Sequence, residues 1–122
     1  MLSKIKMLSV SLLSLGILGF NSTTANARTQ SCVWEAVKYD KEPSFKPYGT
    51  GQILKLVING NVANFNGSDY VFSHQDKKTN AIYARTEKGI RWHLALTPQP
   101  GGRTMVALVD NVSFITFAGM CQ

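Results

Sequence analysis

Residues 54–72 read LKLVINGNVANFNGSDYVF, in which two Asn-Gly pairs interrupt an alternation of apolar and polar side chains. Asn-Gly is the strongest short signal for a two-residue hairpin turn, because both residues tolerate the positive φ of a type I′ turn. The expected turns, Asn59-Gly60 and Asn66-Gly67, pair Ile58 with Asn61 and Phe65 with Ser68. Both turns place the same apolar side chains on the core face: Leu54, Leu56, Ile58, Ala63, Phe65, Tyr70 and Phe72. Because the two turns agree, the stretch predicts three consecutive antiparallel strands.

The rest of the chain continues with short alternating runs rich in Val, Ile, Phe and Tyr and shows no helical period, which predicts an all-β fold. Residues 40–51 and 98–103 are rich in Pro and Gly and are expected to form loops. Short connections favour a small antiparallel up-and-down barrel of about eight strands, with a two-sheet β-sandwich as the alternative. We expect strands near residues 32–39, 52–58, 61–65, 68–74, 81–86, 90–97, 104–109 and 112–117.

The turn at residues 87–89 decides which side chains of the following hairpin face water. A two-residue turn places Arg85 and Glu87 on the same face as Trp92, whereas a three-residue loop with Gly89 in the left-handed conformation keeps these charges outside. We therefore expect the three-residue loop, with two cross-strand pairs on the outer face: Arg85 with Arg91 and Tyr83 with His93.

This hairpin is the first candidate binding surface. Like charges directly across a strand pair repel each other, so an anion or an acidic partner residue between Arg85 and Arg91 would stabilise them. Tyr83 and His93 add hydrogen-bonding surface beside that site. The alternative is that the arginines point apart into water or that Glu87 neutralises them.

Two other surfaces are candidates for contacts with a protein partner. The loop after the first strand interleaves aromatic residues with lysines, which suits a polyanion, a glycan or an acidic protein but equally suits packing on the barrel: Tyr39, Phe45 and Tyr48. A turn at Asp110-Asn111 that pairs Ala107 with Phe114 leaves an apolar stripe on the outer face of the last hairpin. The loop at residues 40–51, a second sheet, a partner or another subunit would bury this stripe: Val106, Leu108, Ile115 and Phe117.

The N-terminal region has the features of a cleavable secretory signal. Lys4 and Lys6 precede an uncharged apolar run, residues 8–20, and residues 25–27 (Ala-Asn-Ala) supply the small-x-small cleavage pattern. As a helix, the apolar run would extend only about 20 Å, which is short of the ~30 Å hydrocarbon core of a bilayer. We expect residues 1–27 to be removed on export, with no membrane insertion of the remainder.

Cleavage leaves residues 28–122 as a single domain in the periplasm or outside the cell. Loss of Lys4 and Lys6 lowers the net charge from +6 to +4. Because this modest charge is spread along the chain, we expect no nucleic-acid partner. Both cysteines remain, and in an oxidising compartment we expect a disulfide between Cys32 and Cys121 that ties the first strand to the last.

Catalytic and cofactor signatures are missing from the sequence, including Gly-x-Ser-x-Gly, His-Glu-x-x-His, Walker-type loops and paired carboxylates. We therefore expect no enzyme, no metal and no cofactor. The expected function is an exported protein-binding module, with an inhibitor or immunity-type protein as its sharpest version. The alternatives are an assembly subunit that forms homo-oligomers through apolar strand faces and, third, a small secreted enzyme.

Two short motifs resemble those of the small secreted eight-stranded inhibitors of c-type lysozyme, which also have their terminal cysteines joined. Asn66-Gly67-Ser68-Asp69-Tyr70 is similar to the family's Ser-Gly-x-x-Tyr pattern, with Asn in place of the leading Ser. Residues 86–89 (Thr-Glu-Lys-Gly) resemble its Thr-Lys-Gly pattern with one insertion. The two motifs cover nine residues, and the resemblance implies that three side chains face the acidic cleft of the enzyme: Asn66, Tyr70 and Lys88.

Overall fold

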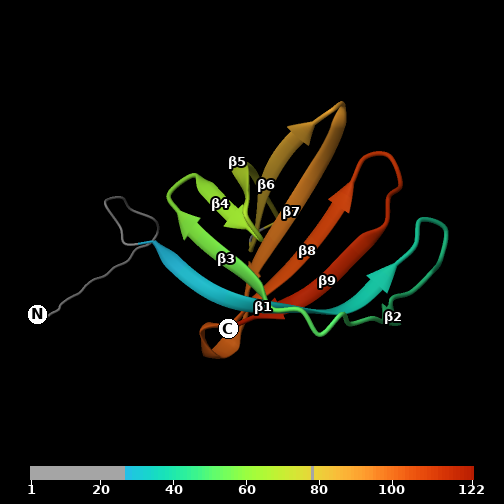
Figure 1. Cartoon of the computed structure of the whole chain (residues 1–122), viewed down its shortest axis with the longest axis horizontal. Helices are drawn as coiled ribbons and strands as arrows, with labels where there is room; N and C mark the ends of the chain where they lie inside the picture. Colours follow the sequence, from blue (N-terminus) through green and yellow to red (C-terminus); the bar gives the residue numbers. More distant parts are fainter. Residues whose placement is uncertain (1–26, 78) are drawn as a thin grey trace, which may run out of the picture.

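The structure is a computed structural model that describes residues 27–77 and 79–122. The predicted signal peptide, residues 1–27, lies outside this part of the chain except for Ala27. The described residues form an antiparallel β-barrel (Figure 1). The strands and one 3₁₀ turn are β1 (Arg28–Lys38), β2 (Lys46–Pro47), β3 (Leu54–Asn59), β4 (Val62–Phe65), β5 (Ser68–Asp76), β6 (Asn80–Glu87), β7 (Ile90–Pro98), η2 (Pro100–Gly102), β8 (Thr104–Asp110) and β9 (Thr116–Cys121).

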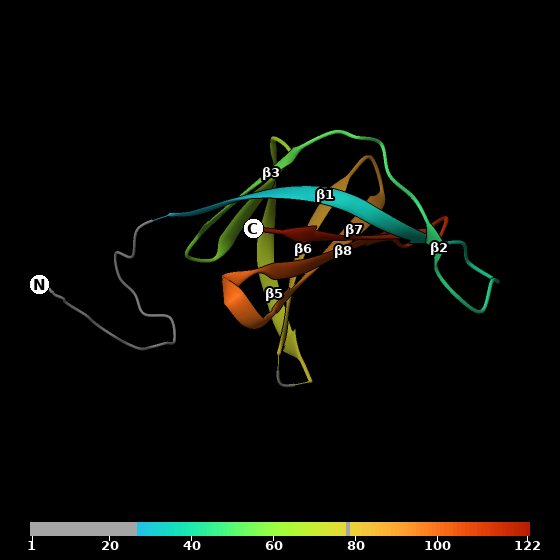
Figure 2. The same cartoon turned by 90° about the horizontal axis from the view of Figure 1, so that it is seen from below.

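Each strand from β3 to β9 pairs with the next, and β1 pairs with both β3 and β9. Eight strands therefore close the barrel, and β2 pairs with the far end of β1 from outside. Figure 2 shows β1 running along the barrel and reaching β2 at its end. The expectation of an all-β barrel is confirmed, and the sandwich is not formed.

A disulfide joins Cys32 to Cys121 across the seam between β1 and β9, as expected. The two residues are direct cross-strand partners. Backbone hydrogen bonds between Ser31 and Gln122 flank the bridge in both directions, each 2.9 Å long. The bridge thus fastens the one seam that joins strands far apart in sequence.

The core fills the barrel from all sides. Leu56, Leu94 and Val106 are completely buried at its centre. The predicted core face of residues 54–72 is confirmed. Phe72 shares this face with its cross-strand partner Tyr83 and packs its ring edge-on against it, but it is 39% exposed. The cluster consists of Cys32, Leu54, Leu56, Ala63, Phe65, Tyr70, Tyr83, Leu94, Leu96, Val106 and Cys121.

The second predicted turn is confirmed and the first is displaced. Asn66 and Gly67 both have positive φ, 52° and 91°, and Phe65 pairs with Ser68. At the first turn, Ile58 pairs with Ala63 rather than Asn61, so the turn residues are Gly60 and Asn61. Of these two, only Gly60 has positive φ, which fits a turn that requires glycine at its first central position. The shift is two residues, so the same side chains still face inward.

The prediction of a three-residue loop at residues 87–89 is wrong. Lys88 and Gly89 form a two-residue turn, with φ of 53° and 80°. The register moves by one residue, which turns Tyr83 and Arg85 inward. This register does not bury the charge of Arg85 completely, because Arg85 lies near the end of the barrel, where its side chain still reaches water. The observed cross-strand pairs are Glu87 with Ile90, Arg85 with Trp92 and Tyr83 with Leu94.

The connection between β8 and β9 is longer than the expected Asp110-Asn111 turn. Ala107 pairs with Ala118 rather than Phe114. The reason is local, because the Asp110 carboxylate accepts hydrogen bonds from the backbone N–H groups of Val112 and Ser113. A side chain that bonds the backbone two or three residues further on stabilises a turn in place of a strand ladder. Residues 111–115 therefore form a loop.

Candidate functional site

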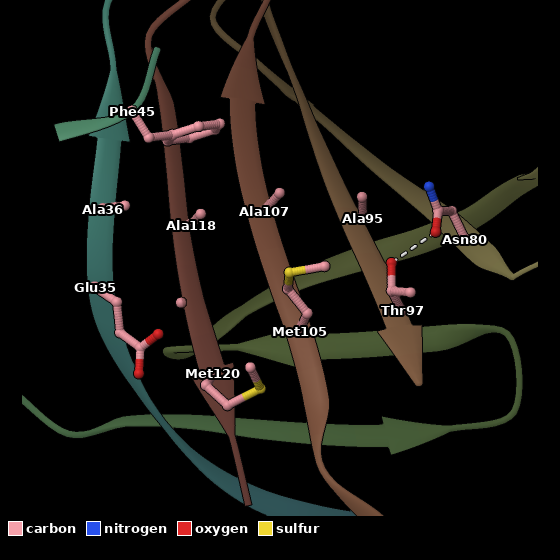
Figure 3. Close-up of a pocket in the computed structure, with 11 residues that line it drawn as sticks. Glu35, Ala36, Phe45, Asn80, Ala95, Thr97, Met105, Ala107, Ala118 and Met120 are labelled. Atoms are coloured by element: carbon pink, nitrogen blue, oxygen red, sulfur yellow. Dashed lines mark hydrogen bonds between the residues drawn. The ribbon is translucent and has the colours of Figure 1, made fainter. Parts of the chain in front are cut away.

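Four alanines form a row across the outer face of β1, β9, β8 and β7 (Figure 3). The row consists of three direct cross-strand pairs: Ala95 with Ala107, Ala107 with Ala118, and Ala118 with Ala36. Paired residues share a face, and their Cβ atoms lie about 5 Å apart. Their methyl groups therefore make one continuous low strip across four strands.

Larger side chains on both sides make this strip the floor of a hollow. Met120, Met105 and Thr97 form the next row along the strands. The Thr97 hydroxyl donates a 2.7 Å hydrogen bond to the Asn80 side-chain oxygen at one end of this wall. The ring of Phe45 stands on the opposite side of the alanine row (Figure 3). The hollow has a volume of about 440 Å³, and we call it the alanine trough.

A β-bulge in β1 places a carboxylate at the rim of the alanine trough. The register between β1 and β9 shifts between Trp34 and Ala36, so Glu35 is an extra residue. Trp34 and Val37 consequently both pack inward, while Glu35 and Ala36 both line the trough. Bulges re-aim side chains in this way. The Glu35 carboxylate is exposed, and within the described ranges it has neither an ion-pair partner nor a hydrogen-bond donor.

Strand β2 holds Phe45 beside the trough. Pro47 pairs with Ala36, and the Tyr48 N–H donates a 2.9 Å hydrogen bond to the Glu35 carbonyl oxygen. The Tyr48 ring packs against Phe117 at a centroid distance of 5.4 Å. These contacts fix both strands of the short β1–β2 ribbon, so the trough wall at Phe45 is part of the folded barrel.

The predicted aromatic loop therefore divides into different environments. Phe45 is 48% exposed and belongs to the alanine trough, whereas Tyr48 anchors the loop to the barrel. Tyr39 is 45% exposed and lies under the Lys46 ammonium, which is 5.5 Å from its ring centroid. Lys46 also forms a 3.0 Å ion pair with Glu42. Of the three aromatic side chains, Phe45 is therefore available to a partner at the trough, whereas Tyr39 and Tyr48 already contact other residues of this chain.

The predicted pairing of Arg85 with Arg91 is wrong, because the corrected register places them on opposite faces of the sheet. Arg85 points into the end of the barrel and forms a 2.6 Å ion pair with Glu87. Arg91 lies outside and donates to the Thr86 hydroxyl at 3.2 Å. The geometry for an anion held between the two arginines is therefore not formed.

Four of the five remaining residues expected to contact a partner also occupy different environments. Tyr70 and Tyr83 are each 6% exposed and belong to the core, where burial raises the pKa of both phenols. Asn66 and Lys88 occupy the tips of turns at the same end of the barrel and are exposed. For these two side chains, contact with a partner stays a prediction.

His93 pairs with Ala84 on the outer face instead of facing Tyr83. Burial, then the charges of Arg91 and His74, lower the pKa of the imidazole below its ordinary value. Burial is the largest of these causes, since an apolar environment disfavours the charged imidazole.

The predicted apolar stripe of the last hairpin is also corrected. Val106 is completely buried, and Leu108 packs against the core. Phe117 pairs with Leu108 and packs its ring on Trp34 at 5.6 Å. Ile115 lies in the loop that follows β8. The outer face of this hairpin carries the alternate residues, which are the alanines and methionines of the trough.

The alanine trough was missed in the sequence because each strand contributes only one small residue to its floor. Its signal is present in part: Ala36, Ala95 and Ala107 lie in three different predicted strands, and Ala118 directly follows the last predicted strand, residues 112–117. The alignment of these residues appears only when the register of β7, β8, β9 and β1 is known. Glu35 depends in addition on the bulge, for which the sequence offers no turn residue.

Comparisons with known proteins add no functional assignment. No family model, no curated protein and no solved structure matches the chain. In the ranges 27–77 and 79–122, no helix has the length and apolar character needed to cross a membrane. The same ranges contain no cluster of three or more His, Cys, Asp or Glu placed to bind a metal ion.

Proposed function

We propose that this protein is an exported, non-enzymatic binding module that holds an apolar segment of a protein partner in its alanine trough. The observation that carries this proposal is the continuous row of four alanines, walled by methionines and Phe45 and bordered by an unpaired carboxylate. A solvated outer face of a barrel is normally polar, and an apolar hollow rimmed by polar groups is typical of an interaction site.

The dimensions of the floor suit a short segment of protein. Three inter-strand spacings of ~4.8 Å give a floor of roughly 14 Å, enough for two or three neighbouring apolar side chains. Methyl groups let those side chains approach the sheet closely. Met105 and Met120 are unbranched and polarizable, so their walls adapt to the shape of the segment.

Charge adds a requirement on the partner. Glu35 is the one charged side chain that lines the trough within the described residues, and it has no cation beside it. A segment with a Lys or Arg next to its apolar side chains would pair with this carboxylate. We therefore propose a partner segment with an apolar centre and a basic flank.

Export is the second part of the proposal. The N-terminal pattern of a secretory signal supports it, and the bridge between Cys32 and Cys121 is of the kind that persists in oxidising compartments. Within that compartment, a protein that blocks or protects a partner by occupying its apolar segment would act as an inhibitor or immunity-type protein.

A random-peptide display selection on the oxidised domain, residues 28–122, tests the binding site. We expect selected peptides to contain two or three apolar residues beside Lys or Arg. Ala107→Arg should weaken their binding by at least tenfold, because the new side chain lies on the floor. Glu35→Gln should remove the preference for the basic residue while leaving apolar recognition in place.

Val71→Arg is the matched control, since Val71 is exposed on the outer face of β5, three strands round the barrel. It should bind the selected peptides as the wild type does. Peptides that bind the Ala107→Arg variant as well as the wild type, or a selection that yields no enriched sequence, would contradict the proposed function.

A further inference from the structure

The loop between β8 and β9, residues 111–115, carries two exposed apolar side chains at the end of the barrel. Val112 is 64% exposed and Phe114 is 53% exposed. An aromatic and a β-branched side chain that are both exposed on one short loop are typical of a contact surface. We call residues 111–115 the apolar loop.

Hydrogen bonds fix the backbone of the apolar loop although its apolar side chains are in water. One Asp110 carboxylate oxygen accepts from the N–H groups of Val112 at 2.8 Å and Ser113 at 2.6 Å, and the other accepts from the Ser113 hydroxyl at 2.6 Å. Asn111 bonds to Arg91 through both its backbone N–H and its side-chain oxygen, each at 3.0 Å. The loop is therefore ordered before any partner binds, which reduces the entropic cost of association.

Phe114 adopts a backbone conformation that its side chain disfavours. Its φ is +56°, in the left-handed region that Gly and Asn occupy most readily. A bulky residue there is strained, and such strain is typical of positions where the side chain serves a function. The ring is not needed for the core, because more than half of it is in water.

Two basic side chains accompany the apolar loop. The backbone N–H and carbonyl groups of Arg91 are bonded to Asn111 of the loop, while its guanidinium donates to the Thr86 hydroxyl. Lys88 lies in the neighbouring turn between β6 and β7. Both are exposed, and neither forms an ion pair with another residue in the described part of the chain. The apolar loop and the two basic side chains of the neighbouring hairpin thus together present an apolar centre with a basic flank, as proposed for the partner.

We propose that the apolar loop of one copy of this chain binds in the alanine trough of a second copy. This inference rests on the proposed function of the trough and names one partner for it. An apolar cavity of ~150 Å³ accommodates a benzene ring, so a hollow of about 440 Å³ has room for the Phe114 ring and for Val112. In the complex, Arg91 or Lys88 of one copy approaches Glu35 of the other.

The loop lies at the end of the barrel and the trough on its side, so the two contact surfaces are different. Each copy then uses its loop for one neighbour and its trough for another. Such a head-to-tail contact extends into a chain of copies unless the rotation closes a ring. This places the chain among assembly proteins as well as binding modules, with the same trough serving both roles.

Complementation between two defective variants tests the arrangement. Phe114→Asn removes the ring and suits the left-handed conformation, and Ala107→Arg fills the trough. Sedimentation of the oxidised domain from about 10 µM to about 1 mM covers the range in which small interfaces associate. We expect the wild type to form species larger than a dimer, and each variant alone to associate at least tenfold more weakly. A mixture of the two retains one intact loop and one intact trough and should form a 1:1 heterodimer that grows no further.

Ile53→Ser is the matched control, because Ile53 is 64% exposed but lies outside the apolar loop, and it should associate like the wild type. Charge reversal gives a second measurement: Glu35→Arg and Arg91→Glu should each weaken association, and their mixture should restore it. A monomer at every concentration would overturn this inference, whereas trough-dependent peptide binding would leave the proposed function standing. A dimer that Ala107→Arg abolishes and Phe114→Asn does not affect would also overturn it, since the two copies would then pack trough to trough.

Discussion

Gly119 is the position of the barrel where a single methyl group has no room. It lies in β9 opposite Trp34, and a Cβ there would overlap the Val33 carbonyl oxygen. The same Cβ would lie 3.2 Å from the Trp34 Cα. Because these neighbours are backbone atoms of the bulged part of β1, rotation of a side chain cannot relieve the contact. The glycine therefore lets β1 and β9 approach each other beside the disulfide.

We predict that Gly119→Ala lowers the free energy of unfolding by about 1–3 kcal/mol, the usual cost of overpacking a rigid site. Urea unfolding followed by tryptophan fluorescence measures the loss. Gly49→Ala is the control, since its Cβ would meet the nearest atom, the Trp34 carbonyl oxygen, at an ordinary 3.5 Å. Equal stability of the two variants would show that β1 moves to accommodate the methyl group.

Asp110 gives the apolar loop a dependence on pH. The hydrogen bonds from the Ser113 hydroxyl and the Ser113 N–H, with a further one from the Val112 N–H, lower the pKa of its carboxyl group. A carboxyl whose pKa is lower in the folded state stabilises the fold above its unfolded pKa of ~3.9, and this contribution is lost as the pH falls through the folded value.

We predict that Asp110→Asn is less stable than the wild type by about 1 kcal/mol at pH 7, the usual contribution of a capping hydrogen bond. Because protonation removes the same charge from the wild type, the difference should shrink as the pH is lowered below 4. Urea unfolding of both proteins at a series of pH values measures this convergence. A difference that is constant with pH would assign the loss to something other than the carboxylate charge.

Among the elements, two hairpins use the same type of turn with different residues. Asn66-Gly67 and Lys88-Gly89 both have positive φ at both central positions. Asn tolerates this conformation well, whereas Lys does so at a cost. The β6–β7 hairpin therefore carries a small local strain that the β4–β5 hairpin avoids.

We predict that Lys88→Asn raises the free energy of unfolding by about 0.5 kcal/mol and that Asn66→Lys lowers it by a similar amount. Thermal unfolding of the two variants beside the wild type gives the comparison. Both side chains are exposed and lie in turns, so packing contributes little to either change. A loss of stability in Lys88→Asn would mean that the lysine makes a contact that offsets its backbone strain.

The same two turns show how far the sequence predicts the elements. The register of β4 and β5 was predicted correctly, because Asn followed by Gly is typical of one turn type. The register of β6 and β7 was predicted incorrectly from Lys88-Gly89, because Lys is not typical of positions with positive φ. The expected cost of burying Arg85 and Glu87 favoured the other register. Arg85 and Glu87 stay partly in water in the observed register, because they lie at the open end of the barrel, where their side chains are 31% and 52% exposed.

The predicted binding surfaces depended on that register and on the β8–β9 loop. A shift of one residue at Lys88-Gly89 separates Arg85 from Arg91, and the inward position of Val106 removes the expected apolar stripe. Phe45 alone of the proposed contact residues lines the alanine trough. The floor of the trough takes one alanine from each strand, and a single alanine in a strand predicts no site. The trough can therefore be recognised only when the pairing of the strands in the closed barrel is known.

At the scale of the whole molecule, the barrel depends on one covalent link between strands that are neighbours in space and distant in sequence. Cys32 and Cys121 are separated by 89 positions. In the chain-entropy model, a bridge that closes a loop of this length contributes about 4–5 kcal/mol at most. Small domains have a total stability of ~5–15 kcal/mol, so the bridge is a major contributor.

We predict that replacing both cysteines by Ala lowers the free energy of unfolding by about 2–5 kcal/mol, measured in urea. The wild type should lose a similar amount on addition of dithiothreitol, and the double variant should not respond to the reagent. If reduction leaves the wild-type midpoint unchanged, hydrogen bonds along β1 and β9 alone hold the seam.

The seam between β1 and β9 also sets an order of events in the making of the protein. Consecutive strands from β3 to β9 meet their partners through hairpins or short loops, as soon as each pair has been synthesised. One edge of β1 has to wait for residues 116–121. Until then the nascent sheet has two unpaired edge strands. Incomplete β proteins aggregate through such edges. The interval before the last strand arrives is therefore when a holding chaperone would matter most to this chain.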